Sequence, residues 1–193
     1  MATATLIVLI AIATGAGVLA SRSEGADAPR TRMAWIRAVL YWLLTIVVAF
    51  EMAAGGLWDL IRIEYVRVIL TRLGYPLYLL YIIGIPRIPC AFVLLLPRFP
   101  RLKEWAYAGA FFNYMGAAAS HLLSGSNRSQ WYGPLLLALF TLVSWALRPP
   151  ARRLPQPACG RQVPLVAWGV PVLMVLTMLA AAFLTLPKGA PPQ

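Results

Sequence analysis

Six long apolar runs, separated by short segments rich in arginine and proline, constrain the fold of this chain more than any other feature. A helix of about 20 apolar residues crosses the hydrocarbon core of a membrane, which is about 30 Å thick. Hydrophobic residues make up 61% of the sequence and charged residues only 12%, a balance typical of membrane proteins. The sequence therefore predicts an all-α, polytopic membrane protein with six transmembrane helices, at about residues 6–20, 35–57, 75–96, 104–123, 131–147 and 164–186.

The first apolar run has a second interpretation, as a secretory signal that is removed. The stretch Ala26-Asp27-Ala28 resembles a cleavage site, but the residues before the run carry no basic side chain, as a signal peptide would. Arginines follow the run instead, beginning with Arg22. We therefore expect an uncleaved first helix with its N-terminus outside, while the retention of residues 1–28 in the cell stays open.

The basic residues give evidence on orientation that is independent of hydropathy. The formal net charge is +11, but the basic residues lie between apolar runs rather than on a polar domain, which argues against nucleic-acid binding. If the runs alternate across the membrane, eleven basic residues fall on one side and five on the other, and the positive-inside rule places both termini outside. The basic residues beside the fourth and fifth runs are interpreted as topology signals that also bind anionic lipids: Arg98, Arg101, Lys103, Arg148, Arg152 and Arg153.

Two segments depart from simple spanning helices. Residues 58–74, WDLIRIEYVRVILTRLG, mix charged and aliphatic side chains, and they predict a short interfacial helix on the outer side with Gly74 as its stop signal. The third run contains Pro86 and Pro89, each of which removes a backbone donor. We therefore expect that this helix is not straight.

Three ionisable residues lie within the apolar runs: Glu51, Arg87 and His121. A charge at the centre of a membrane helix costs roughly 2.5–3.5 kcal/mol, so each of them needs a partner or a function. Their depths allow either a Glu51–Arg87 pair or a Glu51–His121 pair, and both stay open. For Glu51 and Arg87, the structural interpretation is a buried ion pair that fixes helix register, and the functional one is substrate or proton handling.

The fourth run places Tyr107, Ala110, Tyr114, Ala117 and His121 on one helix face. Small residues around them predict either the packing seam of a bundle or a groove for a flat ligand. The only histidine has three interpretations: an interfacial residue, a hydrogen-bonding or proton-transfer partner of a quinone, or an axial ligand of a haem or chlorophyll-type cofactor.

Three stretches resemble the DoxX-like family of small bacterial membrane proteins: GYPLYLLYIIGIPRI at 74–88, LPRFPRLKEWAYAGAFFNYMGAAASHL at 96–122, and SWALRPPARRL at 144–154. The resemblance implies a four-helix membrane bundle, here matching the second to fifth runs, in the bacterial cytoplasmic membrane. It divides the chain into an N-terminal helix and loop (1–33), the bundle (34–154), and a C-terminal helix and tail (155–193). It also implies an association with quinone-linked sulfur oxidation or membrane oxidoreductase assemblies, as for some relatives.

Three classes of function follow. The first is a non-catalytic accessory or structural subunit of a membrane redox or energy-transducing complex, in contact with lipids and other membrane subunits. The second is a quinone-interacting oxidoreductase subunit with His121, Tyr114 and Glu51 at its site, or a subunit that binds haem or a chlorophyll-type cofactor. A small transporter ranks last, because the sequence shows no inverted repeat. No metal site is predicted, because Cys90 and Cys159 have no CxxC spacing.

Overall fold

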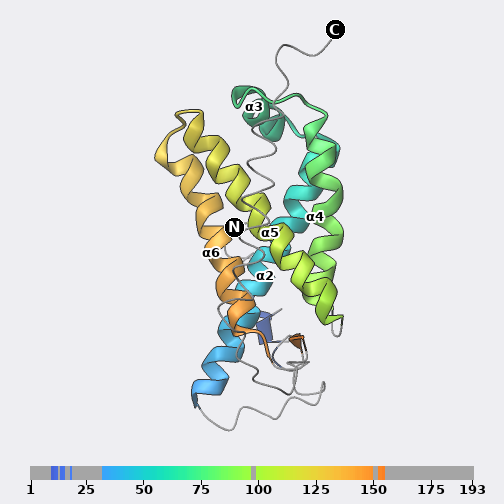
Figure 1. Ribbon diagram of the computed structural model, residues 1–193, viewed down its shortest axis with the longest axis vertical. Helices are drawn as coiled ribbons and strands as arrows, with labels where there is room; N and C mark the ends of the chain where they lie inside the picture. Colours follow the sequence, from blue (N-terminus) through green and yellow to red (C-terminus); the bar gives the residue numbers. More distant parts are fainter. Residues whose placement is uncertain are drawn as a thin grey trace, which may run out of the picture. The chain divides into compact units, whose positions relative to one another are not determined.

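The computed structural model describes residues 10–12, 14–15, 18, 32–96, 99–149 and 152–154. All regular secondary structure in these residues is helical, which confirms the all-α prediction. The sixth apolar run, most of the first, and Arg98 and Cys159 lie outside the described residues. From residue 32 onward the described residues form five helices, which Figure 1 labels: α2 (Arg32–Ile61), α3 (Glu64–Arg72), α4 (Leu79–Leu95), α5 (Pro100–Leu123) and α6 (Arg128–Leu147).

The four long helices form a closed ring of contacts. α2 packs against α4 and α6, and α5 packs against the same two helices, so α2 and α5 face each other across the bundle. Figure 1 shows α3 at the end of the bundle where α2 ends and α4 begins. Small and medium-sized apolar side chains fill the centre, among them Val48, Ala49, Met52, Leu94 and Ala110. The four long helices correspond to the second to fifth apolar runs.

Within the described part of the chain, two helices have the length and composition needed to cross a membrane, α2 and α6. α4 is apolar but has only 17 residues. It continues as a single helix through both Pro86 and Pro89. Hydropathy predicts six spans, whereas two of the described helices meet the length and composition requirement. The number of six spans therefore stays a prediction.

The end of α2 differs from the prediction. The helix continues past Leu57 to Ile61, and Arg62 then adopts a φ of 54°. A left-handed residue cannot continue a right-handed helix, so the chain turns there. The next helix, α3, begins at Glu64 rather than at Trp58, because the first residues of the expected interfacial helix form the last turn of α2.

The predicted stop signal at the end of α3 is confirmed. Gly74 has a φ of 80°, a conformation that glycine adopts without a steric penalty. The Gly74 N–H donates to the Thr71 carbonyl at 3.0 Å, and the Tyr75 N–H donates to the Leu70 carbonyl at 3.1 Å. These two bonds are those of a Schellman motif, which satisfies the last carbonyls of a helix.

Basic side chains close the C-terminal turn of α4. Lys103 Nζ donates to the carbonyl oxygens of Val93 at 2.6 Å and Leu94 at 2.8 Å, and Arg152 Nη1 donates to that of Leu95 at 3.3 Å. The last carbonyls of a helix have no partner within it, and positive charge is favourable at this end. Lys103 and Arg152 are both buried, so these side chains belong to the packed interior.

Two further arginines hold the end of α6. Arg148 Nη2 donates to Glu104 Oε1 at 2.7 Å, and Arg153 Nε donates to the carbonyl oxygen of Arg148 at 2.7 Å. Arg101, by contrast, is exposed. The topology and lipid-binding roles of these basic residues stay predictions; the contacts show that most of them also have a structural role.

Candidate functional site

Two acidic side chains of α2 meet at Arg87. Its Nη2 donates to Glu51 Oε1 at 2.6 Å, and its Nη1 donates to Asp59 Oδ2 at 2.8 Å. Both carboxyl groups belong to α2, where the eight-residue separation of Glu51 and Asp59 corresponds to just over two helical turns and brings both side chains to one face. The guanidinium of α4 therefore lies along α2 and bridges two of its turns.

Glycine on α2 provides the space for this guanidinium. Gly55 stands midway between Glu51 and Asp59, and a Cβ atom there would lie 2.3 Å from Arg87 Nη2. No ordinary side chain fits at that distance, because the van der Waals contact of two such atoms is above 3 Å. The Arg87 guanidinium therefore packs directly against the backbone at Gly55.

Two more glycines let the backbones of α2 and α4 approach each other. A Cβ atom at Gly84 would lie 2.9 Å from the Cβ of Asp59, and one at Gly56 would lie 3.1 Å from the carbonyl oxygen of Gly84. Small residues at helix crossings have this effect in membrane proteins generally. The close crossing brings Arg87 into reach of both carboxyl groups.

Tyr114 connects α5 to the same group of charges. Its hydroxyl donates to Glu51 Oε2 at 2.5 Å, so each oxygen of the Glu51 carboxylate accepts a hydrogen bond. The Arg87 and Asp59 side chains are 13% and 8% exposed, and that of Glu51 is 34% exposed. We name Glu51, Asp59, Arg87 and Tyr114 the Arg87 cluster; it joins three of the four long helices.

Asp59 is the member of the Arg87 cluster that the sequence did not reveal. It was assigned to an interfacial segment, but α2 extends far enough to include it. The signal was present as Glu51, Gly55 and Asp59, four residues apart, which places a glycine between two acids on one face of α2. That pattern indicates space for a long cationic side chain from a neighbouring helix.

Tyr107, although on the same face of α5 as Tyr114, belongs to a second polar layer. Its hydroxyl lies 2.9 Å from Ser144 Oγ of α6, and Ser144 Oγ lies 2.8 Å from Thr45 Oγ1 of α2. The seven residues between the two tyrosines correspond to about 10 Å along the helix axis. The Tyr41 hydroxyl is buried and has no hydrogen-bond partner among the described residues.

His121 lies apart from the Arg87 cluster. Its Nδ1 is 3.4 Å from Ser126 Oγ, in the turn that follows α5. Of the two pairs that depth alone allowed, the structure forms Glu51–Arg87. The buried face of α5 also passes through Ala118 rather than Ala117, because an α-helix drifts by about 20° for every seven residues.

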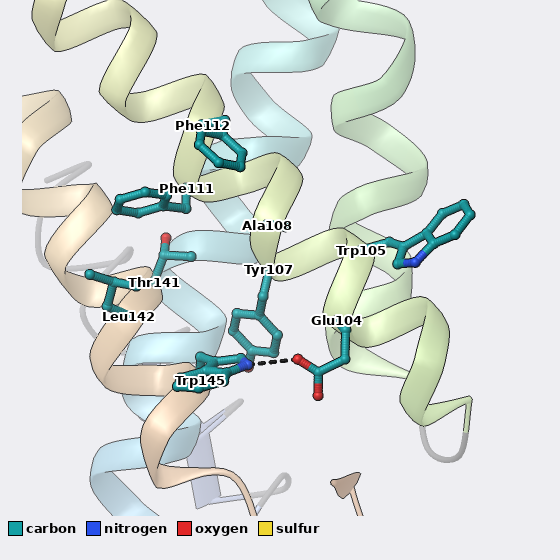
Figure 2. A pocket seen from close by; sticks show the side chains of 9 residues that line it. All are labelled: Glu104, Trp105, Tyr107, Ala108, Phe111, Phe112, Thr141, Leu142 and Trp145. Atoms are coloured by element: carbon teal, nitrogen blue, oxygen red, sulfur yellow. Dashed lines mark hydrogen bonds between the residues drawn. The ribbon is translucent and has the colours of Figure 1, made fainter. Parts of the chain in front are cut away.

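Grooves flank α5 on both sides. The α5–α6 groove has a volume of 430 Å³, and Figure 2 shows Phe111 and Phe112 at one end of it and Glu104 and Trp145 at the other. The indole N–H of Trp145 donates to Glu104 Oε2 at 2.7 Å, so the polar atoms at that end are paired with each other.

The α4–α5 groove has a volume of 530 Å³ and lies next to the Arg87 cluster. Its polar lining residues are Arg87, Cys90 and Asn113, and the rest of the lining is apolar or aromatic. Within the described residues, no group of three His, Cys, Asp or Glu side chains is placed to hold a metal ion. An apolar groove with a few polar groups is the usual form of a small-molecule site.

Comparison with known proteins gives a family. A family model described as the DoxX-like family matches residues 43–144, which is 102 of the 193 residues and therefore more than half of the chain. The chain belongs to the DoxX-like family. No curated protein and no solved structure matches it. The DoxX-like family is one of membrane proteins, and the whole Arg87 cluster lies inside the matched segment.

The charge balance of the Arg87 cluster gives a first prediction. Replacing Arg87 by Met leaves the buried carboxyl group of Asp59 and the partly exposed one of Glu51 without a counter-charge, and we expect the free energy of unfolding to fall by about 3–5 kcal/mol. Adding Glu51→Gln and Asp59→Asn removes those charges and should restore most of the loss. Unfolding in mixed micelles, followed by circular dichroism, measures both effects. A triple variant no more stable than Arg87→Met would show that the charges do not act as one group.

Proposed function

We infer that this DoxX-like protein is an accessory integral-membrane subunit of a bacterial redox or energy-transducing complex, without catalysis of its own. It would reside in the cytoplasmic membrane with six spans and both termini outside, as the hydropathy and the distribution of basic residues predict. Its contribution to the complex would be a rigid bundle on which another subunit docks.

The outward face of α5 is the observation that carries this proposal. Trp105 and Phe112 are 76% and 70% exposed, and Gly109, Gly116 and Ala119 lie between and beyond them at helical spacing. A Cβ atom at Gly109 or Gly116 would meet no neighbouring atom within 4 Å. We call these five residues the α5 stripe; it presents two open notches, one between the aromatic side chains and one beyond Phe112.

Such a stripe suits a transmembrane helix of another subunit. Helices in a membrane gain little from hydrophobicity when they associate, because lipid is as apolar as they are, and they depend on close packing at small residues. Side chains of a partner helix would enter the two notches, while Trp105 and Phe112 would pack alongside it. The Arg87 cluster supports the same view, since its charges are used to join the helices of the bundle.

Filling the notches should remove the partner. We expect the Gly109→Leu/Gly116→Leu variant to fold, because leucine is a better helix former than glycine by roughly 0.5–1 kcal/mol and the added atoms meet open space. Extraction from native membranes in mild detergent, followed by native gel electrophoresis and mass spectrometry, should show the wild-type protein with other subunits and the variant without them.

Ala53→Leu is the matched control, because Ala53 is a small exposed residue on a different long helix. This variant should keep the partners. A wild-type protein that migrates as a solitary monomer, or a double-leucine variant that retains all partners, would contradict the proposal.

A quinone-interacting subunit is the second candidate function. It is favoured by the α4–α5 groove, which places Arg87, Cys90 and Asn113 in an otherwise apolar lining; Arg87 in turn is bonded to Glu51. The amide of Asn113 would donate to a quinone carbonyl, and the rings would lie against the open backbone at Gly109. Haem or chlorophyll binding at His121, and transport through α4, stay predictions of the sequence.

Substitutions at the groove and at His121 separate these alternatives. If the α4–α5 groove binds quinone, Asn113→Leu should weaken the binding of a short-chain quinone to the purified protein. We expect the dissociation constant to rise about tenfold, because the variant loses one hydrogen bond to the quinone carbonyl. His121→Ala should leave binding unchanged, because His121 contacts Ser126 in the turn after α5 and does not line the groove. Titration calorimetry in detergent measures this. Equal affinity of Asn113→Leu and wild type would exclude the groove.

A further inference from the structure

The Arg87 cluster contains one more acid than base. Two carboxyl groups, Glu51 and Asp59, share a single guanidinium, and Tyr114 contributes a neutral hydroxyl. Arg62 follows the end of α2, three residues after Asp59, and its guanidinium carbon lies 5.3 Å from the centre of the Tyr81 ring. No described salt bridge joins Arg62 to either acid. With both acids ionised, the cluster would carry an uncompensated negative charge inside the bundle.

The two carboxyl groups are not equivalent. Glu51 accepts a hydrogen bond on each oxygen, from Arg87 and from Tyr114, and both donors stabilise its ionised form. Asp59 accepts one, from Arg87 on Oδ2, and this is the single hydrogen bond that the described residues give its carboxyl group. Its side chain is also the less exposed of the two, at 8% against 34%.

The position of Asp59 in α2 adds to this difference. It lies in the last turn of the helix, where the aligned peptide dipoles disfavour a negative charge. Glu51 is eight residues earlier and outside the range of that effect. A buried carboxylate that shares its counter-charge with a second acid is costly, and a proton removes that cost without displacing any side chain.

We propose that Asp59 is a proton-exchange site of this protein. One proton, taken from water at the α3 end of the bundle, resides on Asp59 Oδ1 and neutralises the Arg87 cluster, while Glu51 and Arg87 stay ionised and paired. Loss of the proton leaves a second carboxylate on Arg87 Nη1 and tightens the contact between α2 and α4. The site is therefore a carboxyl group that couples protonation to the packing of two helices, and it does not depend on the proposed docking of a partner.

Infrared difference spectroscopy over a pH step tests this in the full chain. A protonated buried carboxyl group has a C=O band that is absent from the carboxylate, so wild-type protein should show one such band that disappears as the pH rises. Asp59→Asn should abolish the band. Glu64→Gln, the matched control with the same change in charge at an exposed acid outside the Arg87 cluster, should retain it. Glu51→Gln should make the band disappear at lower pH, because Asp59 then has Arg87 to itself.

Isotope labelling assigns the band without a substitution at the site. Asp27 and Asp59 are the only aspartates of the sequence, so in an Asp27→Asn background ¹³C-aspartate labels Asp59 alone. The band should then shift to lower frequency. This measurement decides the matter even if Asp59→Asn does not fold.

Several results would overturn the proposal. A band that does not shift on ¹³C-aspartate labelling, or that Glu51→Gln removes while Asp59→Asn retains it, would place the proton elsewhere. Absence of any pH-dependent carboxyl band would show that no proton exchanges. A spectrum that responds to sodium concentration and not to pH would mean that a metal cation supplies the missing charge.

Discussion

The rest of the bundle depends on one contact, the packing of the Arg87 guanidinium against Gly55 of α2. Arg87 reaches both Glu51 and Asp59 only because Gly55 leaves room between them and because Gly56 and Gly84 bring the two backbones together. A buried ion pair adds little to stability by itself, since each charge loses its hydration. Its effect here is on register: a shift of α4 by one turn would separate the charges and leave each unpaired.

The other helices are attached to this pair by polar contacts of the same kind. Tyr114 adds α5 through Glu51, and Ser144 adds α6 through Tyr107 and Thr45. Between the two polar layers lies an apolar zone that includes Val48 and Ala110. Polar groups thus face inward and fix which helices meet, whereas the outer surface is largely apolar and aromatic.

The sequence predicted the four long helices of the described residues well, because long apolar runs mark where such helices lie. It also predicted the stop at Gly74 and included the Glu51–Arg87 pair among two alternatives, which only the three-dimensional arrangement of α2 and α4 could separate. Asp59 was missed because hydropathy ended the second run before α2 itself ends. The burial of Lys103 and Arg152 was missed for a different reason. The sequence around a long basic residue at a helix end does not distinguish a side chain that extends outward to lipid from one that extends inward to a carbonyl.

The thermodynamic stability of Gly55→Ala tests the central claim most directly. At an unobstructed helical position, replacing glycine by alanine raises the free energy of unfolding by up to about 1 kcal/mol, and Gly109→Ala serves as that reference because its Cβ would meet open space. At Gly55 the new Cβ would displace a guanidinium that is hydrogen-bonded to a carboxyl group on each side, so we predict a change of opposite sign, a loss of at least about 1–2 kcal/mol. If Gly55→Ala were instead as stabilising as Gly109→Ala, Arg87 would not be seated on α2, and the account of how the bundle is held together would be wrong.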